Sequence, residues 1–143
     1  MRLIKVESTS EHLKTLYRLL SERPPHANIS HSSMPSYEEH VMFVNTDPYF
    51  KWYMISVDDE LVGSVYLTWQ NEIGISILKE YNGNGYATDA LELFIATHEP
   101  LGGVPSNRAG SFIAHIAPEN ERSKALFERL GFVHVSDTYR LER

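Results

Sequence analysis

The chain has 143 residues, 42% hydrophobic and 22% charged, a composition typical of one globular domain that can bury a core. Its formal net charge of −6 argues against nonspecific nucleic-acid binding, which needs a basic surface, and is compatible with a cationic small substrate. The absence of cysteine excludes a disulfide framework, a zinc–thiolate site and a cysteine nucleophile, and it fits a reducing compartment. Because the N-terminus shows neither a signal peptide nor a membrane span, we expect a cytoplasmic protein without a membrane partner.

The first 45 residues predict one strand and two helices. Residues 3–6 alternate weakly and predict a short strand. Residues 10–20 carry leucines and a tyrosine at helical spacing, with Thr9 or Ser10 as the cap. The tetrad at residues 36–39, Ser-Tyr-Glu-Glu, has the capping-box pattern, so a second helix is expected to begin there and to run to about residue 45.

The middle of the chain predicts three strands and a helix. Residues 50–57 and 61–69 are rich in aromatic and β-branched side chains, and the polar residues between them predict a hairpin. Residues 72–78 predict a further strand. After a glycine-rich turn, residues 87–99 have the periodicity of an amphipathic helix.

The last third predicts two more strands around a helix. Residues 111–116 and 132–139 have strand character, and the helix at residues 120–130 ends at Gly131, a left-handed cap. The order βααβββαβαβ predicts a single α/β domain over residues 1–143. We expect a mixed central sheet of about six strands, with helices on both faces.

The turn at residues 80–88 is the most informative segment, because a strand, two glycines and a helix N-terminus follow one another there. Such a turn exposes backbone N–H groups, lets a phosphate come close and adds the favourable helix dipole. A dinucleotide fingerprint would need a third glycine where Thr88 stands. A P-loop would need a Gly-Lys-Ser/Thr triplet, which the chain lacks.

A third interpretation fits both halves of the chain. The run Asn82-Gly83-Asn84-Gly85-Tyr86-Ala87 resembles the Q/R-x-x-G-x-G/A signature of the GNAT superfamily of N-acetyltransferases. Residues 118–132 are similar to the family's other signature, P-E-N-x-x-S-x-x-L-Y/F-x-x-L-G-F. The two signatures stand in the right order, and the predicted element order agrees with the family fold.

The resemblance implies that acetyl-CoA is the co-substrate and that the glycine turn cradles its pyrophosphate. In the family, the preceding strand splays from its neighbour, so that its backbone pairs with the pantetheine arm and stabilises the oxyanion. The cofactor-binding residues implied in this way come from that strand, the turn and the second signature: Ile75, Ser76, Ile77, Asn82, Gly83, Asn84, Gly85, Tyr86, Ala87, Thr88, Asn120, Ser123 and Phe127.

Two positions depart from the family pattern, and a third has an alternative role. Asn82 stands where Gln or Arg is usual, and backbone amides can still hold the phosphates. Phe127 stands where many members carry a tyrosine that protonates the departing thiolate, which phenylalanine cannot do. Asn120 is equally well explained as a helix N-cap and nothing more.

Glu72 and His115 are the candidate catalytic residues. Glu72 opens the strand beside which an amine would approach, and a carboxylate can take the proton that an amine must lose before it attacks. The alternative for Glu72 is a solvated strand end. His115 is a second candidate base, and its alternative is a hydrogen-bonded core histidine.

The acceptor is expected to be a small-molecule or peptide primary amine, with an amino sugar among the candidates. In the family the loop between the first two helices lines the acceptor site, which points to Asn28, His31 and Met34. The spacing of His26, His31 and His40 matches no standard zinc pattern, so no metal is expected. No nucleic-acid partner is expected, and a homodimer stays open because members of the family often form dimers.

Two alternatives to acetyl transfer remain at this point. One is a noncatalytic module that binds coenzyme A, an interpretation that Phe127 favours and that the glycine turn, Asn120 and Glu72 disfavour. The other is an acyltransferase that uses a longer acyl-CoA, which depends on the length of a pocket.

Overall fold

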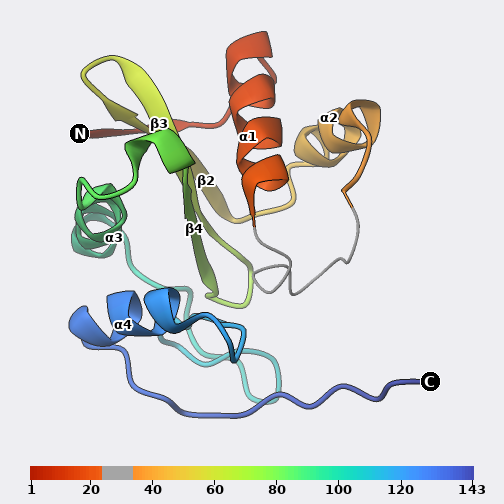
Figure 1. The fold of residues 1–143 in the computed structure, drawn as a ribbon. Helices are drawn as coiled ribbons and strands as arrows, with labels where there is room; N and C mark the ends of the chain where they lie inside the picture. Colours follow the sequence, from red (N-terminus) through yellow and green to blue (C-terminus); the bar gives the residue numbers. More distant parts are fainter. Residues whose placement is uncertain (24–33) are drawn as a thin grey trace.

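A computed structural model describes residues 1–23 and 34–143 of the chain (Figure 1). Four strands, four α-helices and one 3-10 helix form within these ranges. In chain order they are β1 (Arg2–Lys5), α1 (Ser10–Glu22), α2 (Tyr37–Asn45), β2 (Lys51–Val57), β3 (Glu60–Leu67), β4 (Ile73–Ile77), η2 (Lys79–Tyr81), α3 (Tyr86–Thr97) and α4 (Glu121–Arg129).

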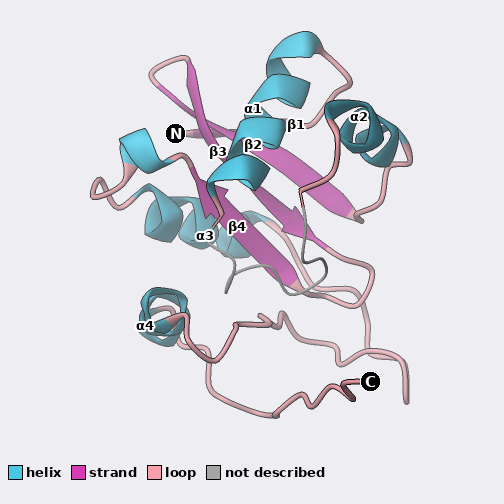
Figure 2. Cartoon of the chain, turned by 45° about the vertical axis from the view of Figure 1, so that its right-hand side comes forward, coloured by secondary structure: helices cyan, strands magenta, loops and turns pink. Residues whose placement is uncertain are grey.

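The strands form one antiparallel sheet in the order β1-β2-β3-β4, so every neighbour in the sheet is also a neighbour in sequence (Figure 2). The polar turn at residues 58–59 joins β2 and β3, as the hairpin pattern predicts, and both aspartates there adopt positive φ. In β3 and β4, Tyr66 lies opposite Gly74 and Ser64 lies opposite Ser76. Side chains two residues apart share a face, so Glu72, Gly74 and Ser76 mark one face of β4.

The two faces of the sheet carry separate apolar cores. On one face, α1 and α2 bury leucines and a valine against Met54 and Leu78. On the other face, α3 packs Leu91 and Phe94 against Ile55, Val65 and Leu67, and Phe127 of α4 joins them. Figure 1 shows α3 on the opposite side of the strands from α1 and α2. The expectation of helices on both faces is confirmed.

The helix starts follow the sequence signals. The Thr9 hydroxyl accepts the N–H of His12 at the start of α1. At α2 the Ser36 hydroxyl accepts the N–H of Glu39, and the Glu39 carboxylate accepts the N–H of Ser36, each at 3.1 Å. This reciprocal pair is the capping box that the tetrad predicts. It fixes where α2 begins.

The expectation of a mixed sheet of about six strands is wrong. Residues 111–116 form no strand and make a single parallel bridge, between Ile113 and Glu72. Residues 132–139 also form no strand, and Val133 and Val135 are each 77% exposed (Figure 2). The physical reason is that strand formation is cooperative. A segment of alternating apolar residues becomes a strand only when a neighbouring strand pairs with its backbone. Because residues 111–116 pair at only one point, they offer no edge to a further strand.

Candidate active site

The glycine turn adopts the geometry that its sequence predicts. Gly83 and Gly85 have φ of 86° and 73°, a region that favours glycine, and Gly85 is the N-cap of α3. The first backbone hydrogen bond of α3 runs from the N–H of Asp89 to the carbonyl of Gly85. The N–H groups of Tyr86, Ala87 and Thr88 therefore have no partner within the helix. A Cβ on either glycine would meet nothing within 4 Å, so open space lies in front of the turn.

Side chains at the turn shape the backbone. The Asn84 amide donates to the carbonyl of Tyr81 at 2.9 Å, which leaves the Asn84 backbone for a ligand. Asn82, Gly83, Asn84 and Gly85 are all exposed. The turn itself contains no lysine or arginine, so the positive potential there comes from the N–H groups and the helix dipole.

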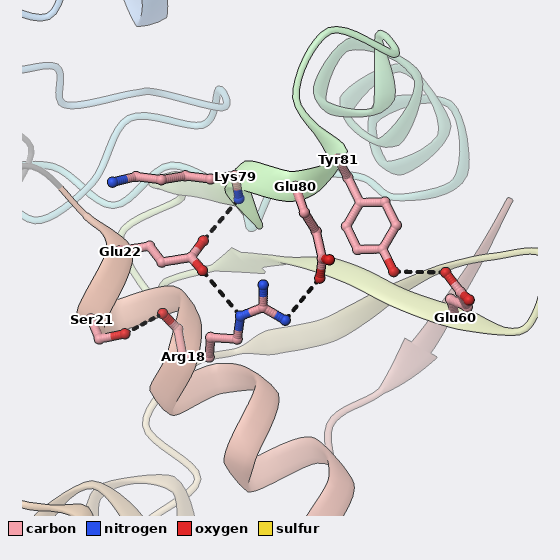
Figure 3. Close-up of polar contacts among 7 residues, drawn as sticks. All are labelled: Arg18, Ser21, Glu22, Glu60, Lys79, Glu80 and Tyr81. Atoms are coloured by element: carbon pink, nitrogen blue, oxygen red, sulfur yellow. Dashed lines mark hydrogen bonds and ion pairs between the residues drawn. The ribbon is translucent and has the colours of Figure 1, made fainter.

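Helix α1 fixes the start of this turn (Figure 3). One oxygen of the Glu22 carboxylate accepts the backbone N–H of Lys79 at 2.8 Å, and the other accepts Nε of Arg18 at 3.0 Å. The same guanidinium contacts Glu80 at 2.8 Å. Both ion pairs are partly exposed to solvent, so they contribute little to the free energy of unfolding and serve mainly to position η2. They tie η2 to a helix that is itself buried against the sheet.

Tyr81 anchors the turn from the other side. Its hydroxyl donates to the Glu60 carboxylate at 2.7 Å (Figure 3). This hydrogen bond, followed by partial desolvation and the charge of Glu60, raises the pKa of Tyr81 to about 12. The phenol therefore stays protonated at neutral pH and keeps the bond, which links η2 to the start of β3.

Strand β4 has one paired edge and one largely open edge. Leu78 N–H bonds to Val62 and Thr68 N–H bonds to Glu72, so the even-numbered residues of this stretch turn their backbone toward β3. The odd-numbered residues turn theirs outward, and Ile73 N–H bonds to the carbonyl of Ile113. Beyond that bond, the N–H and C=O groups of Ile75 and Ile77 face the open edge, whereas those of Ser76 face β3.

Asn71 holds the segment that returns to this edge. It is fully buried in the turn after β3, with φ of 66°. Its side-chain amide donates to the carbonyls of Leu101 and Ala109, each at 2.8 Å, and its side-chain oxygen accepts the N–H of Leu101 at 2.7 Å. Its backbone carbonyl accepts the N–H of Ile113 at 2.9 Å. No role in the site was predicted for this residue from the sequence.

The Asn71 contacts bring the two candidate catalytic residues together. Nδ1 of His115 lies 3.5 Å from Oε2 of Glu72, and the Glu72 N–H bonds to the Thr68 hydroxyl at 3.0 Å. The side chains of Glu72 and His115 are 27% and 52% exposed. His115 is therefore not a core histidine. Both side chains are reached by solvent.

The second signature places its residues at the start and in the buried face of α4. The Asn120 side-chain oxygen accepts the N–H of Ser123 at 3.2 Å, so the N-cap role is present and the amide nitrogen stays available. Phe127 is buried and packs against Phe132, with ring centroids 5.1 Å apart. Its side chain belongs to the core, and no hydroxyl stands at that position.

The expected acceptor residues are only partly described. Asn28 and His31 lie outside the described residues, as does His26, and Met34 is exposed just before α2. His40 is buried, its pKa is lowered by desolvation, and its Nε2 has no hydrogen-bond partner within the described ranges. Among residues 1–23 and 34–143, no three His, Asp or Glu side chains gather as a metal site would need. None of the helices described there is both long and apolar enough to cross a membrane.

Comparisons with known proteins agree with this arrangement. The family model described as "Acetyltransferase (GNAT) domain" matches residues 2–133. An acetyltransferase from Thermus thermophilus superposes with a TM-score of 0.67 at 22% identity, over 95% of this chain and 88% of that one. No curated protein sequence matches the chain significantly.

Two further solved structures share the fold. A variant of the spermidine N-acetyltransferase SpeG from Vibrio cholerae has a TM-score of 0.67 at 20% identity, over 94% of this chain and 80% of that one. The ribosomal L7/L12 α-N-protein acetyltransferase RimL, in complex with coenzyme A, has a TM-score of 0.66 at 17% identity, over 89% and 76%. At these identities the likeness shows the fold.

We predict that Asn71→Ala lowers the free energy of unfolding by about 2–4 kcal/mol, because it removes three hydrogen bonds and leaves buried backbone groups unpaired. Urea denaturation measures this, and hydrogen exchange should show faster exchange at Leu101 and Ile113. Asn107→Ala in the exposed loop is the control and should change stability by no more than about 0.5 kcal/mol. Equal effects from the two variants would contradict the anchoring role of Asn71.

Proposed function

Because the chain belongs to the GNAT acetyltransferase family, we propose that it transfers an acetyl group from acetyl-CoA to a primary amine by direct attack in a ternary complex. The observation that carries this proposal is the open edge of β4, which leads from the glycine turn to the Glu72–His115 pair. Residues 73–77 span about 13 Å in an extended strand. An extended arm paired along that edge connects a phosphate at the turn with an acyl group beside Glu72.

The donor side is built mainly from backbone. The N–H groups from Gly83 to Thr88 would hold the pyrophosphate, and the outward groups of Ile75 and Ile77 would pair with the pantetheine amides. A backbone N–H of β4 would also stabilise the oxyanion. The amide nitrogen of Asn120 is free to donate while its oxygen caps α4. The identity of the side chain at position 82 should therefore have little effect on coenzyme binding.

The chemistry requires only proton transfer besides acyl transfer. An aliphatic amine enters as an ammonium ion, and Glu72 takes one proton from it. The neutral nitrogen attacks the thioester carbonyl, so an N–C bond forms and the C–S bond breaks. The coenzyme leaves as a thiolate, takes a proton from water since Phe127 has none to give, and the amide nitrogen releases its surplus proton. His115 would pass the proton of Glu72 to solvent.

The acceptor is proposed as a class of amines and not as a single compound. SpeG is named for spermidine and RimL for a ribosomal protein, so structural neighbours act on both small and peptide amines. We propose a small-molecule or peptide amine for this chain, amino sugars included. A direct attack needs no acyl-enzyme, in agreement with the absence of cysteine.

Coenzyme binding and turnover test this function directly. We expect acetyl-CoA to bind in isothermal titration and free thiol to appear with at least one amine from a panel of polyamines, amino sugars, amino acids and peptides. Binding without thiol release on any acceptor would favour the noncatalytic module. Faster release from butyryl-CoA or longer donors would favour the alternative acyltransferase.

Glu72→Gln should lower kcat/KM about 100-fold, because general-base catalysis contributes roughly 10²–10⁴ and the amide cannot take the proton. The ascending limb of the pH profile should also shift toward the pKa of the free amine. Glu92→Gln on the exposed side of α3 is the matched control and should leave both unchanged. A Glu72→Gln enzyme with near-wild-type kcat/KM and profile would remove the base role.

Gly85→Ala should raise the KM for acetyl-CoA roughly tenfold, since a left-handed alanine costs about 1 kcal/mol and its Cβ projects into the space in front of the turn. Gly131→Ala is the matched control, because it also has positive φ and an open Cβ position but follows α4. Both variants should lose similar stability. A rise in KM of the same size in Gly131→Ala would show that strain alone explains the effect.

A further inference from the structure

A stacked pair of tyrosines lies beside Glu72 and has no role in the donor site. The rings of Tyr49 and Tyr66 stack with centroids 4.1 Å apart and an interplanar angle of 6°. Trp52 meets the Tyr49 ring edge-on at 4.8 Å. Both tyrosines are partly buried, and their hydroxyl groups hydrogen-bond to each other.

Gly74 fixes where the Tyr66 hydroxyl lies. A Cβ added to Gly74 would fall 2.1 Å from Cζ and 2.4 Å from the hydroxyl oxygen of Tyr66, so the end of the ring rests on the glycine backbone. Glu72 is two residues from Gly74 and shares its face of β4, about 7 Å away along the strand. The hydroxyl is thus confined near the Glu72 carboxylate by a position that only glycine can fill.

The charges around the hydroxyls agree with this geometry. Burial raises the pKa of Tyr66, and the negative charge of Glu72 raises it further. The pKa of Tyr49 is also raised, first by burial and then by Tyr66, with Glu72 contributing. Arg23 acts on both phenols in the opposite direction. Both hydroxyls stay protonated at neutral pH, and the negative charge of Glu72 raises the pKa of both.

Two polar side chains come toward Glu72 from different sides of β4. His115 comes from the segment beside the outer edge, and Tyr66 comes from β3 on the inner edge. The Glu72 carboxylate meets His115 at 3.5 Å, and 27% of the Glu72 side chain is exposed to solvent. An ammonium group has three N–H donors and no acceptor, so it matches a carboxylate flanked by a phenol oxygen.

We propose, on the basis of the proposed function, that the Tyr66 hydroxyl and the Glu72 carboxylate together hold the acceptor as an ammonium ion, so that the enzyme selects aliphatic amines over arylamines. One N–H of the ammonium bonds to the carboxylate and another to the phenol oxygen. When Glu72 takes its proton, the phenol oxygen retains the amine while the freed lone pair turns to the thioester. Arylamines are neutral at pH 7 and lose the charge-assisted contact.

Tyr66→Phe tests this role, because it removes the hydroxyl and keeps the ring on Gly74. We expect the KM for an aliphatic amine to rise about tenfold, as for loss of a hydrogen bond to a charged group. The KM for acetyl-CoA should not change, and the Tm should fall only slightly, through loss of the hydrogen bond to Tyr49. The preference for an aliphatic amine over an arylamine should fall by a similar factor, which a merely structural role of the ring would not produce.

Tyr53→Phe is the matched control. Tyr53 lies on the neighbouring strand β2 and points to the opposite face, where its hydroxyl pairs with Nε2 of His98 at 2.8 Å. Removal of the Tyr53 hydroxyl should lower the free energy of unfolding and leave the KM for the amine unchanged. An equal rise in KM in both variants would overturn the assignment to Tyr66.

A second measurement needs no turnover. In protein labelled with ¹³C at tyrosine Cζ and saturated with coenzyme A, butylammonium chloride should shift the Tyr66 signal, which Tyr66→Phe identifies by its loss. Equimolar 1-butanol should not shift it, and Glu72→Gln should abolish the butylammonium shift. Equal shifts from both probes, or none from either, would overturn the inference while thiol release still supports the proposed function. Failure to bind acetyl-CoA would instead contradict the proposed function.

Discussion

The buried side chain of Asn71 is the constraint on which the site depends. Its amide group satisfies carbonyls of Leu101 and Ala109 and one N–H of Leu101, and its backbone accepts the N–H of Ile113. Because Asn71 is fully buried, its polar side chain must make these hydrogen bonds. A buried polar group without a hydrogen-bond partner would lower the free energy of unfolding by as much as several apolar contacts raise it. The long loop after α3 is thereby tied to the β3–β4 turn, and residues 111–116 begin beside β4 and not elsewhere.

The same constraint explains why β4 is paired at one end of its outer edge and open at the other. The returning segment bonds at Ile73 and Asn71 and then leaves the strand, which carries His115 to Glu72 and exposes the backbone of Ile75 and Ile77. An open strand edge is usually a liability for association. Here the glycine turn and α3 begin just beyond it, so the edge is continuous with an anion site.

The sequence predicted the local features well and the long-range pairing poorly. The capping box at Ser36, the hairpin around residues 58–59 and the left-handed cap at Gly131 all depend on neighbours in the chain, and the structure confirms them. The prediction of a six-stranded mixed sheet was wrong. The strand character of residues 111–116 and 132–139 does not reveal whether a neighbouring strand is available to pair with their backbone. Asn71 and Tyr66 were missed as site residues since their roles depend on Ile113 and Gly74, which no spacing rule connects to them.

The two halves of the site differ in what the sequence can reveal about them. In the proposed function, backbone N–H groups and glycine torsions would make the donor side, and such geometry requires a short motif in the sequence. Side chains from β3, β4 and the segment after the loop would make the acceptor side, and their meeting depends on register: Tyr66 opposite Gly74, and Ile113 beside Glu72. A one-residue slip of β4 would turn Glu72 to the face of α3 and place a branched side chain under Tyr66. Under the proposed function, the choice of acceptor would therefore depend on the sheet register, whereas the donor side would depend on a short local motif.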